Sequence, residues 1–199
     1  MDRIIRSAVP LFLNANYKMW SMQYYNLRLI NPAAQFNWYM YNGSRVNHLL
    51  VPELQSITNF HCSFCDKKEI IEYVNEPTIE HFRPKALYPL LSYYWGNLFL
   101  CCTSCQRKGD EYNRLLLKPD TLDYTFDEYF IIDWPTGFIL PKHNDPHPNF
   151  FRANITIELY GLNKGGRPKA RLNELKSYLK TNTPDIEDFS YRFFINKGL

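Results

Sequence analysis

Two closely spaced pairs of cysteines carry the clearest chemistry in this sequence. Cys62 and Cys65 form one C-x-x-C pair, and Cys102 and Cys105 form another. A C-x-x-C turn can offer two thiolates to one ion, and two such turns complete the tetrahedral shell that zinc prefers. A redox pair would not need a second copy. The spacing therefore predicts a structural zinc site, because four thiolates leave no open position on the ion for catalysis.

The fifth cysteine, Cys101, directly precedes the second pair and is an alternative ligand. The two-residue spacing favours Cys102 as the ligand. Cys101 would then be a small buried apolar residue, which is a common environment for a free cysteine. We expect a cytoplasmic protein, in which thiols stay reduced, so we expect no disulfides.

The long interval between the cysteine pairs holds a second group of reactive residue types. Glu80 and His81 end a short apolar–polar stretch suited to a strand, and Asn97 opens the apolar run that leads to the second pair. Metal-assisted hydrolysis needs a base to activate water and a cation to stabilise the negative charge that develops. A neutral imidazole suits the first task near pH 7, and a carboxylate is a ligand that Mg²⁺ prefers.

The order of these motifs resembles the HNH, or ββα-metal, family of nucleases. The resemblance is carried by HCSFCD, PTIEHFRPK and NLFLCCTSCQRKGD. In that family two strands and a helix hold one divalent ion, and zinc knuckles often brace the outside. The resemblance implies an α+β fold in which a zinc-stapled ββα-metal core spans residues 60–113.

The flanking regions are expected to be largely helical extensions. In residues 1–59, Val46, Leu49, Leu50 and Leu54 fall at helical spacing, and Pro52 is expected to open or interrupt that helix. Residues 114–199 contain EYFIIDWPTGFIL, which predicts two short strands about a Pro-Thr-Gly turn. The segment GGRPKARLNELKSYLK predicts a basic helix, interpreted as a solvated face or as part of a substrate path.

The resemblance also implies a role for each residue of the site. His81 would be the general base, with its ring held by a neighbouring carbonyl. Glu80 would bind Mg²⁺ or Mn²⁺ from the opposite face of the strand, and Asn97 would fix the loop that carries the base. The cations expected to bind phosphates are Arg83, Lys85, Arg107 and Lys108.

Gln106 departs from the family pattern, which has His or Asn straight after the last cysteine. A glutamine can offer a carbonyl oxygen to a cation, but its extra methylene shifts that oxygen by about one bond length. His143 and His147 are alternative ligands, although loop histidines are the favoured interpretation. The departure supports an alternative function, in which a catalytically impaired, zinc-stabilised subunit binds nucleic acid or protein. In a further alternative the chain is a purely structural subunit.

Composition limits the partners that we expect. The net charge is only +3, so a surface for nucleic acid must be local or shared with a partner. No segment resembles a signal peptide or membrane span, which favours the cytoplasm. The order of motifs is similar to the HNH subunits of bacterial phage-defence systems, of the Septu type and their retron-associated relatives. That similarity implies an ABC/SMC-like ATPase partner, a reverse transcriptase and its multicopy DNA in retron systems, and DNA or RNA as substrate.

Overall fold

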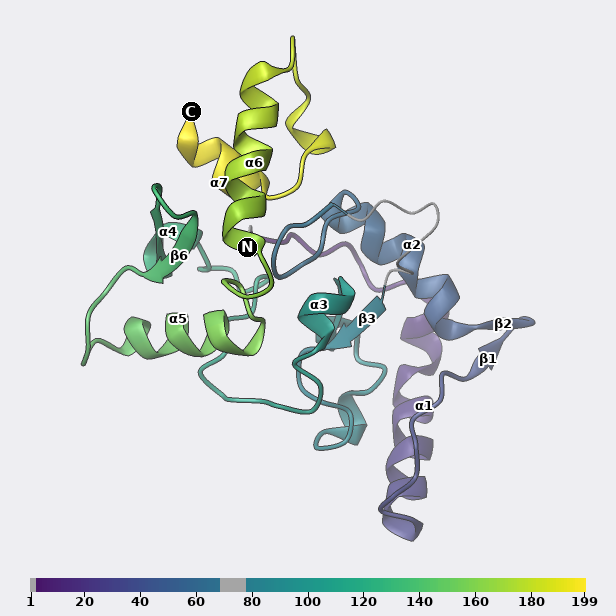
Figure 1. Ribbon diagram of the computed structural model, residues 1–199. Helices are drawn as coiled ribbons and strands as arrows, with labels where there is room; N and C mark the ends of the chain where they lie inside the picture. Colours follow the sequence, from purple (N-terminus) through teal and green to yellow (C-terminus); the bar gives the residue numbers. More distant parts are fainter. Residues whose placement is uncertain (1–2, 69–77) are drawn as a thin grey trace.

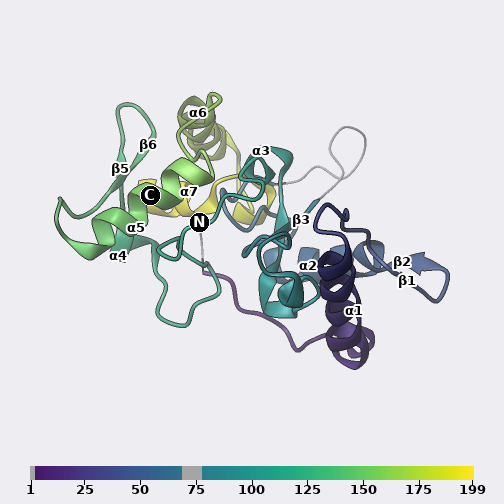
Figure 2. The same ribbon diagram turned by 90° about the horizontal axis from the view of Figure 1, so that it is seen from below.

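The computed structural model describes residues 3–68 and 78–199 of the chain. Helices and two-stranded antiparallel sheets are mixed along the described residues, so the predicted α+β class is confirmed. The N-terminal elements lie on one side of the molecule and the C-terminal elements on the other, with β3 and α3 between them (Figures 1 and 2). No helix in the described ranges is long and apolar enough to cross a membrane.

The N-terminal side is built from two helices and a small hairpin. These elements are α1 (Leu11–Ile30), β1 (Met40–Tyr41), β2 (Ser44–Arg45) and α2 (Val46–Thr58). The predicted apolar spacing places Val46, Leu50 and Leu54 at full burial along α2. The prediction for Pro52 was wrong, because Pro52 lies inside a continuous helix. Pro52 has no N–H to donate to the carbonyl of His48, four residues earlier in the helix. Both residues are exposed, so this carbonyl can accept a hydrogen bond from water instead.

A β-hairpin and a short helix form the centre of the molecule. The elements are β3 (Thr78–His81), η1 (Pro89–Leu91), η2 (Trp95–Asn97), β4 (Leu98–Cys101) and α3 (Thr103–Gln106). In the antiparallel register Glu80 faces Phe99 and His81 faces Leu98. Because side chains alternate along a strand, the hairpin separates two apolar cores. Leu98 packs in the core of the N-terminal elements, and Phe99 packs in the core that contains the cysteines.

The C-terminal side contains the predicted hairpin and the predicted basic helix. Its elements are α4 (Phe126–Tyr129), β5 (Phe130–Asp133), β6 (Phe138–Pro141), α5 (Pro148–Leu159), α6 (Arg167–Lys180), η3 (Ile186–Asp188) and α7 (Arg192–Gly198). Gly137 ends the turn between β5 and β6 with a φ of +73°. A Cβ at Gly137 would collide with the Pro168 carbonyl, so this glycine lets the hairpin approach α6.

Candidate metal centre and candidate active site

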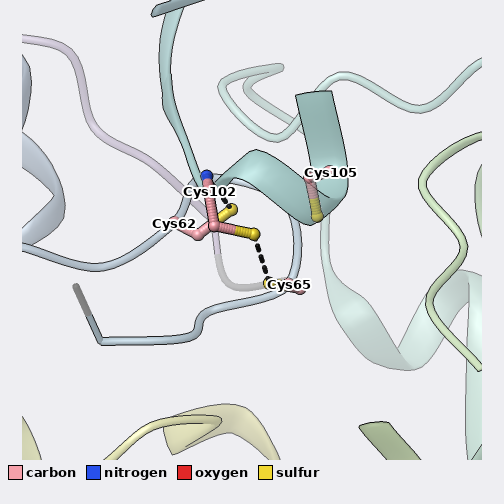
Figure 3. A group of neighbouring side chains, drawn as sticks. All are labelled: Cys62, Cys65, Cys102 and Cys105. Carbon is pink, nitrogen blue, oxygen red and sulfur yellow. Dashed lines mark hydrogen bonds between the residues drawn. The ribbon is translucent and has the colours of Figure 1, made fainter. Parts of the chain in front are cut away.

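The four predicted cysteine ligands meet at one buried point. The sulfur atoms of Cys62, Cys65, Cys102 and Cys105 all lie within 4.8 Å of one another (Figure 3). A tetrahedral zinc with bonds of about 2.3 Å holds its sulfurs about 3.8 Å apart. The sulfurs of Cys65 and Cys102 are 3.7 Å apart. This group can therefore hold a metal such as zinc.

A hydrogen-bonded backbone turn orients each pair of thiols toward the common point. In the first pair, Asp66 N–H donates to the Cys62 carbonyl at 2.9 Å and closes the turn. In the second pair, Cys102 precedes α3 and Cys105 N–H donates back to the Cys102 carbonyl at 3.0 Å. Cys101 lies on β4, is buried, and is not a member of the four-thiol group. The choice of Cys102 over Cys101 therefore agrees with the geometry.

Arg167 is a neighbour of the thiols that the sequence did not reveal. Its Nη2 donates to the sulfur of Cys105 at 3.2 Å and to that of Cys102 at 3.9 Å. Its Nη1 donates to the Tyr160 carbonyl at 2.6 Å. Burial acts to lower the pKa of this guanidinium, but the cysteines raise it, and the pKa lies above its ordinary value. Four thiolates around Zn²⁺ carry a net charge of −2, so this cation would offset part of that charge.

Replacing Arg167 with Gln should weaken the metal centre. The variant loses charge-assisted hydrogen bonds to two sulfurs, and such bonds contribute about 2 kcal/mol to stability. We expect a lower free energy of unfolding and faster loss of zinc to a chromogenic chelator. Lys169→Gln is the matched control, since Lys169 is an exposed cation on the same helix. Equal zinc-release rates in Arg167→Gln and wild type would contradict this role.

A partly buried ion pair joins the first cysteine turn to the C-terminal helix. The Asp66 carboxylate accepts from the Arg192 backbone N–H at 2.6 Å and from Arg192 Nη2 at 2.6 Å. The Asp66 carbonyl also accepts from Tyr191 N–H at 2.7 Å. Asp66 and Arg192 are 126 positions apart in the chain, so no local pattern could predict this pair.

His81 is buried and its ring is held on several sides. Its Nε2 lies 2.9 Å from the carbonyl oxygen of Ser92. The ring of Trp38 stacks on it at 5.5 Å, and Phe36 meets it edge-on at 5.3 Å. Burial lowers the pKa of His81 to about 3. If Nε2–H donates to the carbonyl, the neutral ring leaves Nδ1 as its hydrogen-bond acceptor.

The Asn97 side-chain amide joins two segments near His81, one at Arg83 and one at Leu91. Its Oδ1 accepts from Arg83 N–H at 2.8 Å, and its Nδ2 donates to the Arg83 carbonyl at 3.0 Å. The same Nδ2 donates to the Leu91 carbonyl at 3.1 Å. Leu91 directly precedes Ser92, whose carbonyl contacts the His81 ring. These bonds tie the segment at Arg83 to the segment at Leu91 and Ser92.

Glu80 lies on the opposite face of β3 and is paired with Lys108. The Lys108 Nζ is 2.8 Å from Glu80 Oε1, and both side chains are buried. Burial raises the pKa of Glu80 to about 7, although Lys108 acts to lower it. The expectation that Lys108 binds phosphates is corrected here, since its side chain has no exposed surface. A buried carboxylate is costly without a partner, and Lys108 supplies that partner.

A small pocket of about 140 Å³ gathers several residues of the predicted site. Glu80, His81 and Gln106 line it together with Lys85 and Asp110. The carboxylate and amide oxygens of Glu80, Gln106 and Asp110 are the donor types that Mg²⁺ and Mn²⁺ prefer, so the residues present fit such an ion in kind. The sequence motif contained Asp110 but gave no reason to select it as a ligand.

The remaining predicted residues lie elsewhere. Arg83 is exposed and its guanidinium lies over the Tyr88 ring at 5.6 Å. Arg107 is exposed and lines a larger cavity on the other side of α3. His143 and His147 stack on each other at 4.0 Å and do not line the small pocket, so they remain loop histidines.

Neither a scan against protein-family models nor a search of the curated proteins found a match for this chain.

The buried pair predicts a strong coupling between Glu80 and Lys108. Lys108→Met should lower the free energy of unfolding at pH 8 by about 1 kcal/mol, because Glu80, whose pKa is already raised to about 7, loses its counter-charge and takes up a proton. The double variant Glu80→Gln, Lys108→Met should regain most of that loss. Urea unfolding of wild type, both single variants and the double variant measures the coupling. Purely additive losses would mean that the two side chains do not interact in solution.

Proposed function

We propose that this protein is a divalent-ion-dependent endonuclease of the HNH type that hydrolyses phosphodiester bonds of nucleic acid, with DNA as its substrate. The observation that carries the proposal is the support of His81. The Ser92 carbonyl holds one ring nitrogen, and Asn97 fixes the segment that contains this carbonyl. The other nitrogen, Nδ1, would accept the proton of the water that attacks the phosphorus.

The small pocket determines what reaches His81 in this proposal. A volume of about 140 Å³ is well below the ~300 Å³ at which small-molecule sites usually begin. A single phosphate and water would therefore enter, while the rest of the strand would lie outside. Lys85 lines the pocket and would attract the phosphate, and the exposed Arg83 would bind a neighbouring one.

Glu80, Gln106 and Asp110 are the residues that would hold Mg²⁺ or Mn²⁺ in this proposal. When bound, the ion would supply positive charge to the phosphate and the leaving oxygen. The four-cysteine group would hold a zinc ion with a structural role. It would fix the start of α3, and so Gln106, relative to the strand that carries His81.

A second candidate function is a zinc-stabilised binding subunit without catalysis. The ion pair between Lys108 and Glu80 favours it, because the ammonium already occupies an oxygen of the predicted ligand. Gln106 at the position of His or Asn favours it as well. Binding of nucleic acid without cleavage, in the presence of every partner, would select this candidate.

The phage-defence resemblance extends the proposal to a partner. We infer that the chain is the nuclease effector of such a system and works with an ABC/SMC-like ATPase. The net charge of +3 gives the isolated chain little long-range attraction for phosphate, which supports binding of nucleic acid jointly with the partner. Affinity purification after co-expression with the neighbouring ATPase tests the complex. If the system is a retron, the reverse transcriptase and its multicopy DNA are co-expressed in the same experiment.

The test of the nuclease proposal is cleavage of plasmid and single-stranded DNA with Mg²⁺ or Mn²⁺. The reaction is run with the chain alone and with the neighbouring ATPase, and RNA is the alternative substrate. Metal-dependent cleavage that is lost with EDTA supports the proposal. No cleavage of any of these substrates, with the partner present, would reject it in favour of the binding subunit.

A further inference from the structure

A larger cavity lies on the other side of α3 from the small pocket. Its volume is about 490 Å³, which falls within the range of about 300–1,000 Å³ that is usual for small-molecule sites. The segment after Cys102 forms one wall, and the connection between α5 and α6 forms the opposite wall. The lining of this cavity shares no residue with that of the pocket at His81.

Three exposed cations line the cavity. Lys67 comes from the first cysteine turn, Arg107 from the end of α3, and Lys164 from the connection before α6. None of the three forms an ion pair with any residue in the described ranges. The acidic residues Glu111 and Glu158 also line the cavity, but the cations exceed them in number. Positive charges gathered around one concave surface favour an anionic ligand.

Part of the lining that α5, α6 and their connection contribute is apolar. Leu159, Tyr160 and Ala170 contribute to it. Tyr160 is buried and its ring stacks on Phe64 with 3.9 Å between ring centroids, so it supports this part of the wall from the core side, while the half-buried Leu159 and Ala170 offer the apolar surface. Arg167 also lines the cavity, but its guanidinium is already bonded to protein carbonyls and sulfurs. An apolar surface beside exposed cations suits a ligand with an apolar part and a phosphate.

We propose that this cavity binds a nucleoside phosphate, either as a free nucleotide or as one nucleotide of a strand. The cations at Lys67, Arg107 and Lys164 bind the phosphate, and the base lies against the apolar wall. The volume accommodates one nucleotide. This inference does not rest on the nuclease proposal, since none of these residues takes part in the support of His81.

The experiment measures binding by isothermal titration calorimetry, with the full zinc-loaded chain and without added Mg²⁺ or Mn²⁺. The probes are AMP, inorganic phosphate and a short single-stranded DNA oligonucleotide. The test variant is Arg107→Met, Lys164→Met, and the control is Lys169→Met, an exposed cation on α6 that does not line the cavity. Zinc content and circular dichroism verify that each variant is folded.

We expect AMP to bind the wild type and the control alike, and the test variant at least tenfold more weakly. Oligonucleotide binding with the same sensitivity but no AMP binding would assign the site to a nucleotide within a strand. The proposal is overturned if the double substitution leaves binding unchanged or if neither nucleotide probe binds. It is also overturned if inorganic phosphate binds as tightly as AMP, because the apolar wall would then contribute nothing.

Discussion

His81→Ala should abolish nucleic-acid cleavage while leaving the protein folded. General-base catalysis typically contributes about 10²–10⁴-fold to a rate, so we expect a loss of about 10³-fold. The Ser92 carbonyl would lose its partner and the Trp38 and Phe36 rings would lose their contact with the imidazole, which together cost about 2–4 kcal/mol of stability. Cleavage assays at saturating Mg²⁺, with zinc content measured on the same samples, separate lost chemistry from lost folding.

The pH dependence of cleavage gives a second test of the same site. Burial lowers the pKa of His81 to about 3, so the imidazole stays neutral, and able to accept a proton, down to strongly acidic pH. Burial raises the pKa of Glu80 to about 7, so the carboxylate form to which we assign metal binding grows as pH rises through 7. We therefore expect the metal-dependent rate to rise between about pH 6 and 8 because Glu80 loses its proton. The protonation of His81 does not contribute to this rise.

Two comparisons make the His81 prediction specific. His48→Ala is the matched control, since His48 is exposed on α2 and lies outside both pockets. Asn97→Ala should lower the rate less than His81→Ala does, because Asn97 positions the loop and does not accept the proton. Equal rates in wild type and His81→Ala would remove His81 from the mechanism, whatever the metal requirement.

Removal of the metal from the four-cysteine group should unfold the central part of the protein. Structural zinc sites in small domains contribute about 10 kcal/mol or more of apparent binding energy, which becomes folding energy. All four thiols belong to the core that also contains Phe99 and Tyr160. Without the ion, the thiols take up protons and no longer join the two cysteine turns across that core. We expect Cys65→Ser to lose zinc and near-native circular dichroism together.

The chain offers its own control for this prediction in Cys101. Its sulfur is buried but lies outside the four-thiol group and donates to the Cys102 carbonyl at 3.3 Å. Cys101→Ala should keep one zinc per chain and lose about 1 kcal/mol of stability. Zinc stoichiometry by elemental analysis distinguishes the two variants. Full zinc occupancy in Cys65→Ser would show that the four cysteines are not the ligands.

The parts of the site that depend on neighbouring residues were predictable from the sequence. A C-x-x-C spacing brings two thiols together within one turn, and a Pro-Thr-Gly turn between apolar runs joins two strands. Alternation along a strand placed Glu80 and His81 on opposite faces. The N-terminal helix α2 followed from its apolar spacing, but the effect of Pro52 depended on which side of the helix faced water.

The contacts that give the site its electrostatics were decided by tertiary structure alone. Arg167 meets the thiols from 62 positions beyond Cys105, and Arg192 meets Asp66 from 126 positions away. The sequence placed Lys108 among the phosphate-binding cations, whereas folding buries it against Glu80. The physical reason is the same in each case: a charge pattern in the sequence does not say which charges lose water, and desolvation decides whether a cation binds a ligand or a buried acid.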